Sequence, residues 1–194
     1  MLFKSFSIVF FSLYTGIIID NFFLNFAIAM DILLFSLFTN FVYFCCGAIF
    51  IYNKNQELSY QFYIYFFGVV TIGLISLILN FFTPLSQTVN SIVYIIIILI
   101  FAIKSKLEFH RKHIIFLIIS SLITFLLIFY STVNRPDAGL YHLPYISLIE
   151  ENKIIFGASN IHFRFGHVSI LQYLGAINNN YLFLENGISI PVAS

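Results

Sequence analysis

Charged residues are scarce in this chain, at 9% of its 194 residues, whereas soluble domains carry about 25%. Apolar residues make up 60% of the sequence. This composition excludes an ordinary soluble domain and is typical of an integral membrane protein. The net charge is only +1, so the basic excess of a nucleic-acid-binding protein is missing as well. We therefore expect the lipid bilayer as a partner, and no nucleic acid.

Cysteine is nearly absent too. Cys45 and Cys46 are the only two, and they are adjacent within an apolar run. Neighbouring cysteines rarely form a disulfide because the geometry is strained, so we interpret both as small packing residues. A convincing cleavage site is also lacking after the apolar stretch that follows Lys4. Further apolar stretches come later, which predicts a retained first helix rather than a signal peptide.

The sequence is rich in long apolar segments. Five of them approach the roughly 20 residues that a helix needs to cross a bilayer. Their residue ranges are 5–19, 32–52, 60–82, 88–104 and 114–131. Asp20 and Asp31 bracket a stretch that could be an exposed turn or a continuation of the helix. The sequence predicts an all-α fold: a polytopic transmembrane helix bundle of about five spans in residues 1–131.

Two further features constrain this bundle. Pro84 is expected at a boundary between two helices. Helices associate in lipid through close contacts at small residues, so three glycines are expected to face neighbouring helices. They are Gly47, Gly68 and Gly73.

The basic residues indicate the orientation. They crowd the connection between the last two spans, whereas the connection at 83–90 carries no charge. The crowded residues are Lys104, Lys106, Arg111 and Lys112. Short cytoplasmic loops are rich in Lys and Arg, so this connection is predicted to be cytoplasmic. Counting spans places the N-terminus, with Lys4, in the cytoplasm and 132–194 outside it.

The character of the chain changes at about Thr132, and three of the five histidines lie beyond it. The mixed apolar and polar pattern of 141–151 is typical of a short helix on the membrane surface. A second helix is predicted over 165–177, ended by three asparagines. Its apolar face would contain Val168, Ile170, Leu171 and Leu174. Residues 181–194 resemble the start of an element that is not completed. We treat 132–194 as an extracytoplasmic region with interfacial helices, and as an incomplete domain.

Several residues of this region are candidates for chemistry. Asp137 lies between Pro136 and Gly139, where it could act as a general base or simply form a turn. The histidines at 142, 162 and 167 have spacings of 20 and 5, which match no familiar ligand motif, so neither a metal nor another cofactor is predicted. Arg164 lies between two phenylalanines. It could bind a phosphate while stacking on the rings, or pair with nearby glutamates or lipid headgroups.

Two segments carry a resemblance to a known family. They are DAGLYHLP at 137–144 and GASNIHFRFG at 157–166. Together they resemble the outer loop of bacterial membrane glycosyltransferases of the GT-C superfamily. These enzymes pass a sugar from a polyprenyl-phosphate carrier to an acceptor outside the cytoplasm. The resemblance implies Asp137 as the catalytic base and Arg164 as a contact for the lipid phosphate. Tyr141, His142 and His162 complete the implied substrate-binding residues.

The resemblance also implies a location and a larger assembly. Members of that superfamily have many more helices, so this chain is expected to correspond to the N-terminal part of such an enzyme in the bacterial inner membrane. It would act in surface polysaccharide or glycolipid assembly, with a complementing membrane subunit as a candidate partner. Two other interpretations remain: a non-catalytic membrane protein whose outer loop binds a partner subunit or lipid, and an inactive truncated remnant.

Overall fold

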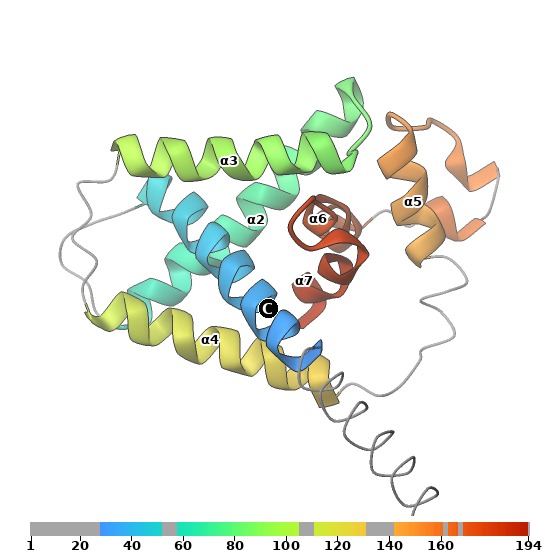
Figure 1. The fold of residues 1–194 in the computed structure, drawn as a ribbon. Coiled ribbons are helices and arrows are strands. Elements are labelled where there is room, and N and C mark those ends of the chain that lie inside the picture. The colour runs from blue at the N-terminus through green and yellow to red at the C-terminus, as the bar shows by residue number, and fades with distance from the viewer. Residues whose placement is uncertain are drawn as a thin grey trace, which may run out of the picture.

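The computed structural model describes residues 28–51, 58–104, 111–130, 142–160, 163–166 and 169–193. Every regular element within these ranges is a helix (Figure 1). The predicted all-α class is therefore confirmed.

Four helices are long and apolar enough to cross a membrane. They are Ile28–Ile51, Tyr60–Phe82 within α2 (Leu58–Phe82), α3 (Gln87–Lys104) and α4 (Arg111–Tyr130). These four match the predicted segments that begin at 32, 60, 88 and 114. The predicted first span, 5–19, and Asp20 lie outside the described residues. Residues 28–30 and Asp31 lie within the helix, and the rest of the stretch between Asp20 and Asp31 lies outside the described residues.

The helix Ile28–Ile51 lies at the centre of the bundle, and we call it the central helix. Its most apolar stretch is 56% buried inside the protein, while no other candidate span exceeds 28%. Figure 1 shows it crossing between α2, α3 and α4. Because this helix has protein on several sides, it can carry polar residues that a lipid-facing helix could not. Ser36, Thr39 and Asn40 are fully buried along it.

Glycines allow the backbones of this helix and α2 to touch. A Cβ atom on Gly47 would overlap the carbonyl oxygen of Ile64, and one on Gly68 would overlap that of Tyr43. Small residues permit this close approach, which supplies the packing energy that holds helices together in lipid. Further along α2, Gly73 faces the Ile170 side chain. The prediction that all three glycines face neighbouring helices is confirmed.

The helix ends collect on two opposite sides of the bundle (Figure 1). Ile51, Leu58, Lys104 and Arg111 end or begin helices on one side. The turn between α2 and α3, which contains Pro84 as predicted, lies on the other. The elements that follow α4 all lie toward this second side, which we call the turn side. These elements are α5 (Leu143–Glu151), η2 (Ala158–Asn160), η3 (Phe163–Gly166), α6 (Ile170–Asn178), η4 (Leu184–Ser189) and α7 (Ile190–Ala193).

The predicted helix over 141–151 is observed as α5, but its apolar face has a different role. Tyr145, Ile146 and Ile149 are buried in a cluster with Leu85 and Tyr173. These side chains therefore cover other parts of the protein, and contact with lipid is not needed to explain them.

The second predicted helix begins later than expected. It starts at Ile170 because Ser169 caps it: the Ser169 side chain accepts a hydrogen bond from the backbone of Leu171, and Gln172 accepts one from the backbone of Ser169. This reciprocal arrangement fixes a helix start. Phe165 instead belongs to η3. The end at Asn178 agrees with the prediction.

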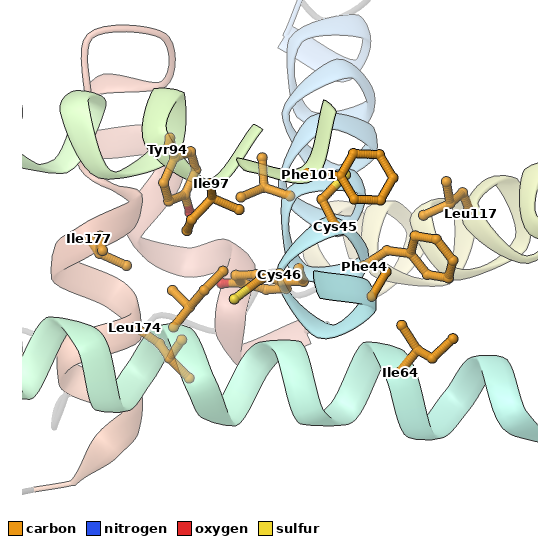
Figure 2. Close-up of a cluster of buried hydrophobic side chains, with 14 of the residues drawn as sticks. Phe44, Cys45, Cys46, Ile64, Tyr94, Ile97, Phe101, Leu117, Leu174 and Ile177 are labelled. Carbon is orange, nitrogen blue, oxygen red and sulfur yellow. The ribbon is translucent and has the colours of Figure 1, made fainter. Parts of the chain in front are cut away.

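The apolar face predicted for this helix is also partly wrong. Leu171 is 49% exposed, whereas Leu174 and Ile177 are buried in the same cluster as residues of the long helices. Figure 2 shows these two side chains from α6 beside Cys46, Tyr94 and Ile97. Hence α6 shares the main core with the candidate spans. Cys45 and Cys46 are buried and unbridged there, which confirms that they are packing residues.

Residues 181–193 form short helices that fold back onto α6. A Cβ on Gly187 would overlap the carbonyl oxygen of Asn178, and Ile190 is buried at the start of α7. Within the described residues, η4 and α7 both contact α6, and α7 also contacts α4. The expectation that 132–194 is an incomplete domain stays a prediction.

Candidate functional site

The residues predicted to carry chemistry are only partly described. Asp137, Tyr141 and His162 lie outside the described residues. The backbone of Arg164 lies in η3, and its side chain is not described. His142 is exposed just before α5, where its side chain makes no capping hydrogen bond to the helix. The structure therefore gives the position of one predicted side chain, and the grouping of the five remains a prediction.

No cluster of three His, Cys, Asp or Glu side chains suited to a metal ion occurs in the part of the chain that the structure describes. One buried histidine, His113, lies at the start of α4. Its ring centroid is 5.5 Å from that of Phe44.

A network of buried amides is the feature that sequence reasoning missed. Asn178, at the end of α6, is fully buried and uses all of its hydrogen-bonding capacity. Its Oδ1 accepts from the hydroxyls of Thr39 (3.3 Å) and Tyr94 (2.7 Å). Its Nδ2 donates to the Tyr43 hydroxyl (2.8 Å) and the Leu174 carbonyl (2.7 Å). One amide thus joins α6 to the central helix and to α3.

A second amide joins the central helix to α2 and α4. Asn40 accepts a hydrogen bond from the Tyr65 hydroxyl at 2.6 Å. It donates to the hydroxyls of Ser121 (3.2 Å) and Thr124 (3.3 Å). The rings of Tyr43 and Tyr65 meet edge to face, with centroids 6.0 Å apart. Polar groups therefore cross the bundle from α4 to α6 without an intervening charged residue.

Asn179 links α5 to α3 through hydrogen bonds. Its Oδ1 accepts from Gln87 Nε2 at 3.0 Å, and its Nδ2 donates to Glu150 Oε1 at 2.9 Å. Its backbone carbonyl accepts from Asn90 Nδ2 at 2.7 Å. Next along the chain, Asn180 shapes the turn into η4, because its Oδ1 accepts from the backbone amides of Leu182 and Phe183.

Asn80, near the end of α2, holds the chain that leaves α5. Its Nδ2 donates to the carbonyls of Ile149 (3.1 Å) and Asn152 (2.9 Å). Its own backbone carbonyl accepts from the amide of Ile154 at 2.9 Å. Asn80 Oδ1 is buried without a protein partner, as is Asn90 Oδ1. Buried acceptors of this kind are positions where ordered water binds.

Tyr173 is one of two tyrosines in the buried cluster that includes residues of α5; the other is Tyr145. Burial, reinforced by Tyr145 nearby, raises the pKa of the Tyr173 phenol above the ordinary value. The hydroxyl therefore stays protonated at neutral pH. It can donate a hydrogen bond but cannot serve as a base.

An apolar groove of about 480 Å³ lies between the central helix and the turn before η4. Its lining residues are Leu34, Phe35, Leu37, Phe38, Phe41, Leu182 and Phe183. The Phe183 ring anchors one wall, with its centroid 4.8 Å from that of Phe35 and 5.5 Å from that of Phe38. A groove without a polar lining side chain suits a hydrocarbon chain.

These observations define a class: a polytopic helical membrane protein whose C-terminal helices fold back into the bundle through an amide network. The comparison with protein families gives one match, to the family described as Domain of unknown function (DUF8201), over residues 1–189. The chain belongs to this family. No curated protein and no solved structure matches it.

The positions of three asparagines in the sequence indicate that they belong to a buried network. Asn40, Asn80 and Asn90 each lie within or beside a long apolar segment. An unpaired amide in hydrocarbon is costly, so such residues are expected to face other helices. The pattern indicates that they are buried, but it does not indicate which partners they find.

Proposed function

We propose that this chain forms part of a GT-C-like membrane glycosyltransferase that takes its sugar from a polyprenyl-phosphate carrier. The resemblance at 137–144 and 157–166 is the starting point, and the apolar groove is the structural observation that supports it. The groove is lined by the middle of the central helix, from Leu34 to Phe41, and by Leu182 and Phe183. Figure 1 shows the start of this helix on the turn side, where α5 also lies. An isoprenoid chain bound there would bring its phosphate to the same side as the proposed catalytic loop.

The proposed chemistry is a transfer between two oxygens. Asp137 takes the proton of the acceptor hydroxyl, whose oxygen then bonds to the anomeric carbon of the sugar. The bond from that carbon to the phosphate oxygen breaks, and polyprenyl phosphate leaves with the electron pair. Arg164 offers a bidentate contact to this phosphate. Tyr141, His142 and His162 are the proposed contacts to the sugar.

The location follows from the same proposal. The N-terminus and 105–113 are on the cytoplasmic side of a bacterial inner membrane, and α5 and the loop with Asp137 are on the outer side. The products are surface polysaccharide or glycolipid of the cell envelope. A complementing membrane subunit would supply further spans of the donor site.

A second candidate function is supported by exposed aromatic rings. Phe156 and Phe163 both belong to the segment after α5, and they are 85% and 69% exposed. Exposed aromatics are typical of binding surfaces. A non-catalytic protein whose outer segment binds a partner subunit or lipid would also present them.

The test uses membranes that contain the full protein and a panel of radiolabelled polyprenyl-phosphate hexoses. Transfer to endogenous acceptor should depend on the protein. Asp137→Asn should lower it about 10²–10⁴-fold, the contribution of a general base. Asp31→Asn, at an exposed aspartate of the central helix, is the matched control and should leave it unchanged. Transfer that is absent with every donor, or that is undiminished in the Asp137 variant, would reject this function.

A further inference from the structure

Exposed aromatic side chains from two distant parts of the chain meet at the end of α2. Phe81 and Phe82 close α2 and are 47% and 70% exposed, and Phe156, 85% exposed, comes from the turn after α5. The rings of Phe81 and Phe156 have centroids 6.4 Å apart. We call Phe81, Phe82, Ile155 and Phe156 the aromatic edge.

The position of this edge is fixed by a buried residue, Asn80. Its side-chain Nδ2 donates to the carbonyl of Asn152, and its backbone carbonyl accepts from the amide of Ile154. These two hydrogen bonds hold the turn against the last turn of α2. The exposure of Phe156 is therefore built into the fold, because the backbone that carries it is tied down on both sides of Lys153.

The aromatic edge continues an apolar stripe along α2. Leu74, Ile78 and Phe81 lie at positions i, i+4 and i+7, which share one face of a helix. All three are at least 45% exposed. On a candidate membrane span, a face that protein does not cover is covered by lipid. Phe156 lies at the end of this face and not on a separate surface.

The length of α2 gives the depth of the edge. The 23 residues from Tyr60 to Phe82 rise about 35 Å at 1.5 Å per residue, slightly more than the roughly 30 Å of hydrocarbon in a bilayer. Phe81 and Phe82 therefore lie near the boundary between acyl chains and headgroups. Lys153 lies between Asn152 and Ile154, the two residues that bind Asn80, and it is exposed. From this position its ammonium can reach lipid phosphate.

We propose that the aromatic edge binds the lipid bilayer at the acyl–headgroup boundary of the leaflet on the turn side. Phenylalanine side chains of interfacial segments insert at the boundary between headgroups and acyl chains, and Lys153 would snorkel to the phosphates. The turn at 152–157 thereby becomes a fixed membrane contact that sets the height of α5 above the bilayer. This inference is independent of any transferase activity.

The absence of tryptophan from the sequence allows a direct test. Phe156→Trp introduces a single tryptophan, which is excited selectively over the 12 tyrosines. The protein is reconstituted in phosphatidylcholine–phosphatidylglycerol vesicles. Emission should shift to the blue. Lipids brominated near the headgroup should quench it more than lipids brominated near the chain ends, and aqueous acrylamide should quench it little.

Two single-tryptophan controls calibrate the measurement. Ile78→Trp, on the lipid-facing stripe, should be quenched most by the deeper bromines. Ser147→Trp, on the exposed polar side of α5, should respond to acrylamide instead. Adding Asn80→Leu to the Phe156→Trp variant removes the side-chain hydrogen bond to Asn152 and leaves the backbone bond to Ile154. It should loosen the turn and raise quenching by acrylamide.

Two results would overturn the proposal. If acrylamide quenches the Phe156→Trp variant as strongly as the Ser147→Trp variant, the edge lies in water. If the fluorophore of the Phe156→Trp variant is protected from both acrylamide and brominated lipid, a protein surface, from a partner or a second copy, covers the edge.

Discussion

Asn178 shows how much of this bundle depends on single amides. It makes four hydrogen bonds within a buried site, to two hydroxyls of the central helix, one of α3 and a carbonyl of α6. Hydrogen bonds between membrane helices average only about 0.6 kcal/mol each. Losing one partner of a buried set is more costly, because the groups that remain are left unsatisfied.

Replacing Asn178 tests this dependence. Asn178→Leu keeps the branching at Cγ but leaves Tyr43 and Tyr94 without their amide partner, so we expect the free energy of unfolding to fall by about 1–3 kcal/mol. Unfolding in detergent, followed by circular dichroism against increasing SDS, measures the loss. Asn160→Leu, at an exposed asparagine, is the control. Equal stability of the two variants would mean that the network contributes little.

At the scale of elements, length and apolarity were sufficient to predict the spans. A helix that crosses lipid must be long and apolar, and the ranges beginning at 32, 60, 88 and 114 show this directly. The face of α6 was not predictable in the same way. Periodicity selected Leu171, but Gly73 on α2 and the amide site of Asn178 set the rotation of the helix. Such contacts connect residues about 100 apart, and no local pattern contains them.

Two glycines on α2 offer a comparison of helix contacts. Gly68→Ala places a Cβ against the backbone carbonyl of Tyr43, which cannot move unless the helices separate. Gly73→Ala meets the side chain of Ile170, which is partly exposed and can turn aside. Overpacking costs about 1–3 kcal/mol where nothing can yield. We expect the midpoint of thermal unfolding, measured by size-exclusion fluorescence, to fall clearly for Gly68→Ala and little for Gly73→Ala. The reverse order would contradict the crossing described here.

At the scale of the molecule, the fold was more predictable than the site. The bundle follows from composition and length, which every residue of a span helps to determine. The proposed site depends on a few residues in irregular segments, where Asp137 and Arg164 have no periodic pattern to reveal their neighbours. His142 could be predicted as a residue near the start of a helix, and it lies there. Its grouping with Asp137 rests on the resemblance alone.

The two-sided arrangement of helix ends leads to a prediction about topology. Arg111 begins α4 among the ends of one side, whereas α5 ends at Glu151 on the turn side (Figure 1). Lys and Arg favour cytoplasmic loops, so fusion junctions at Lys112 and Asn152 should report opposite compartments. Fused green fluorescent protein should be fluorescent at Lys112 and dark at Asn152, and fused alkaline phosphatase should show the reverse activities. A junction at Thr83 must agree with the one at Asn152, because both lie on the turn side. If Lys112 and Asn152 report the same compartment, both the charge argument and the assignment of α4 as a span are wrong.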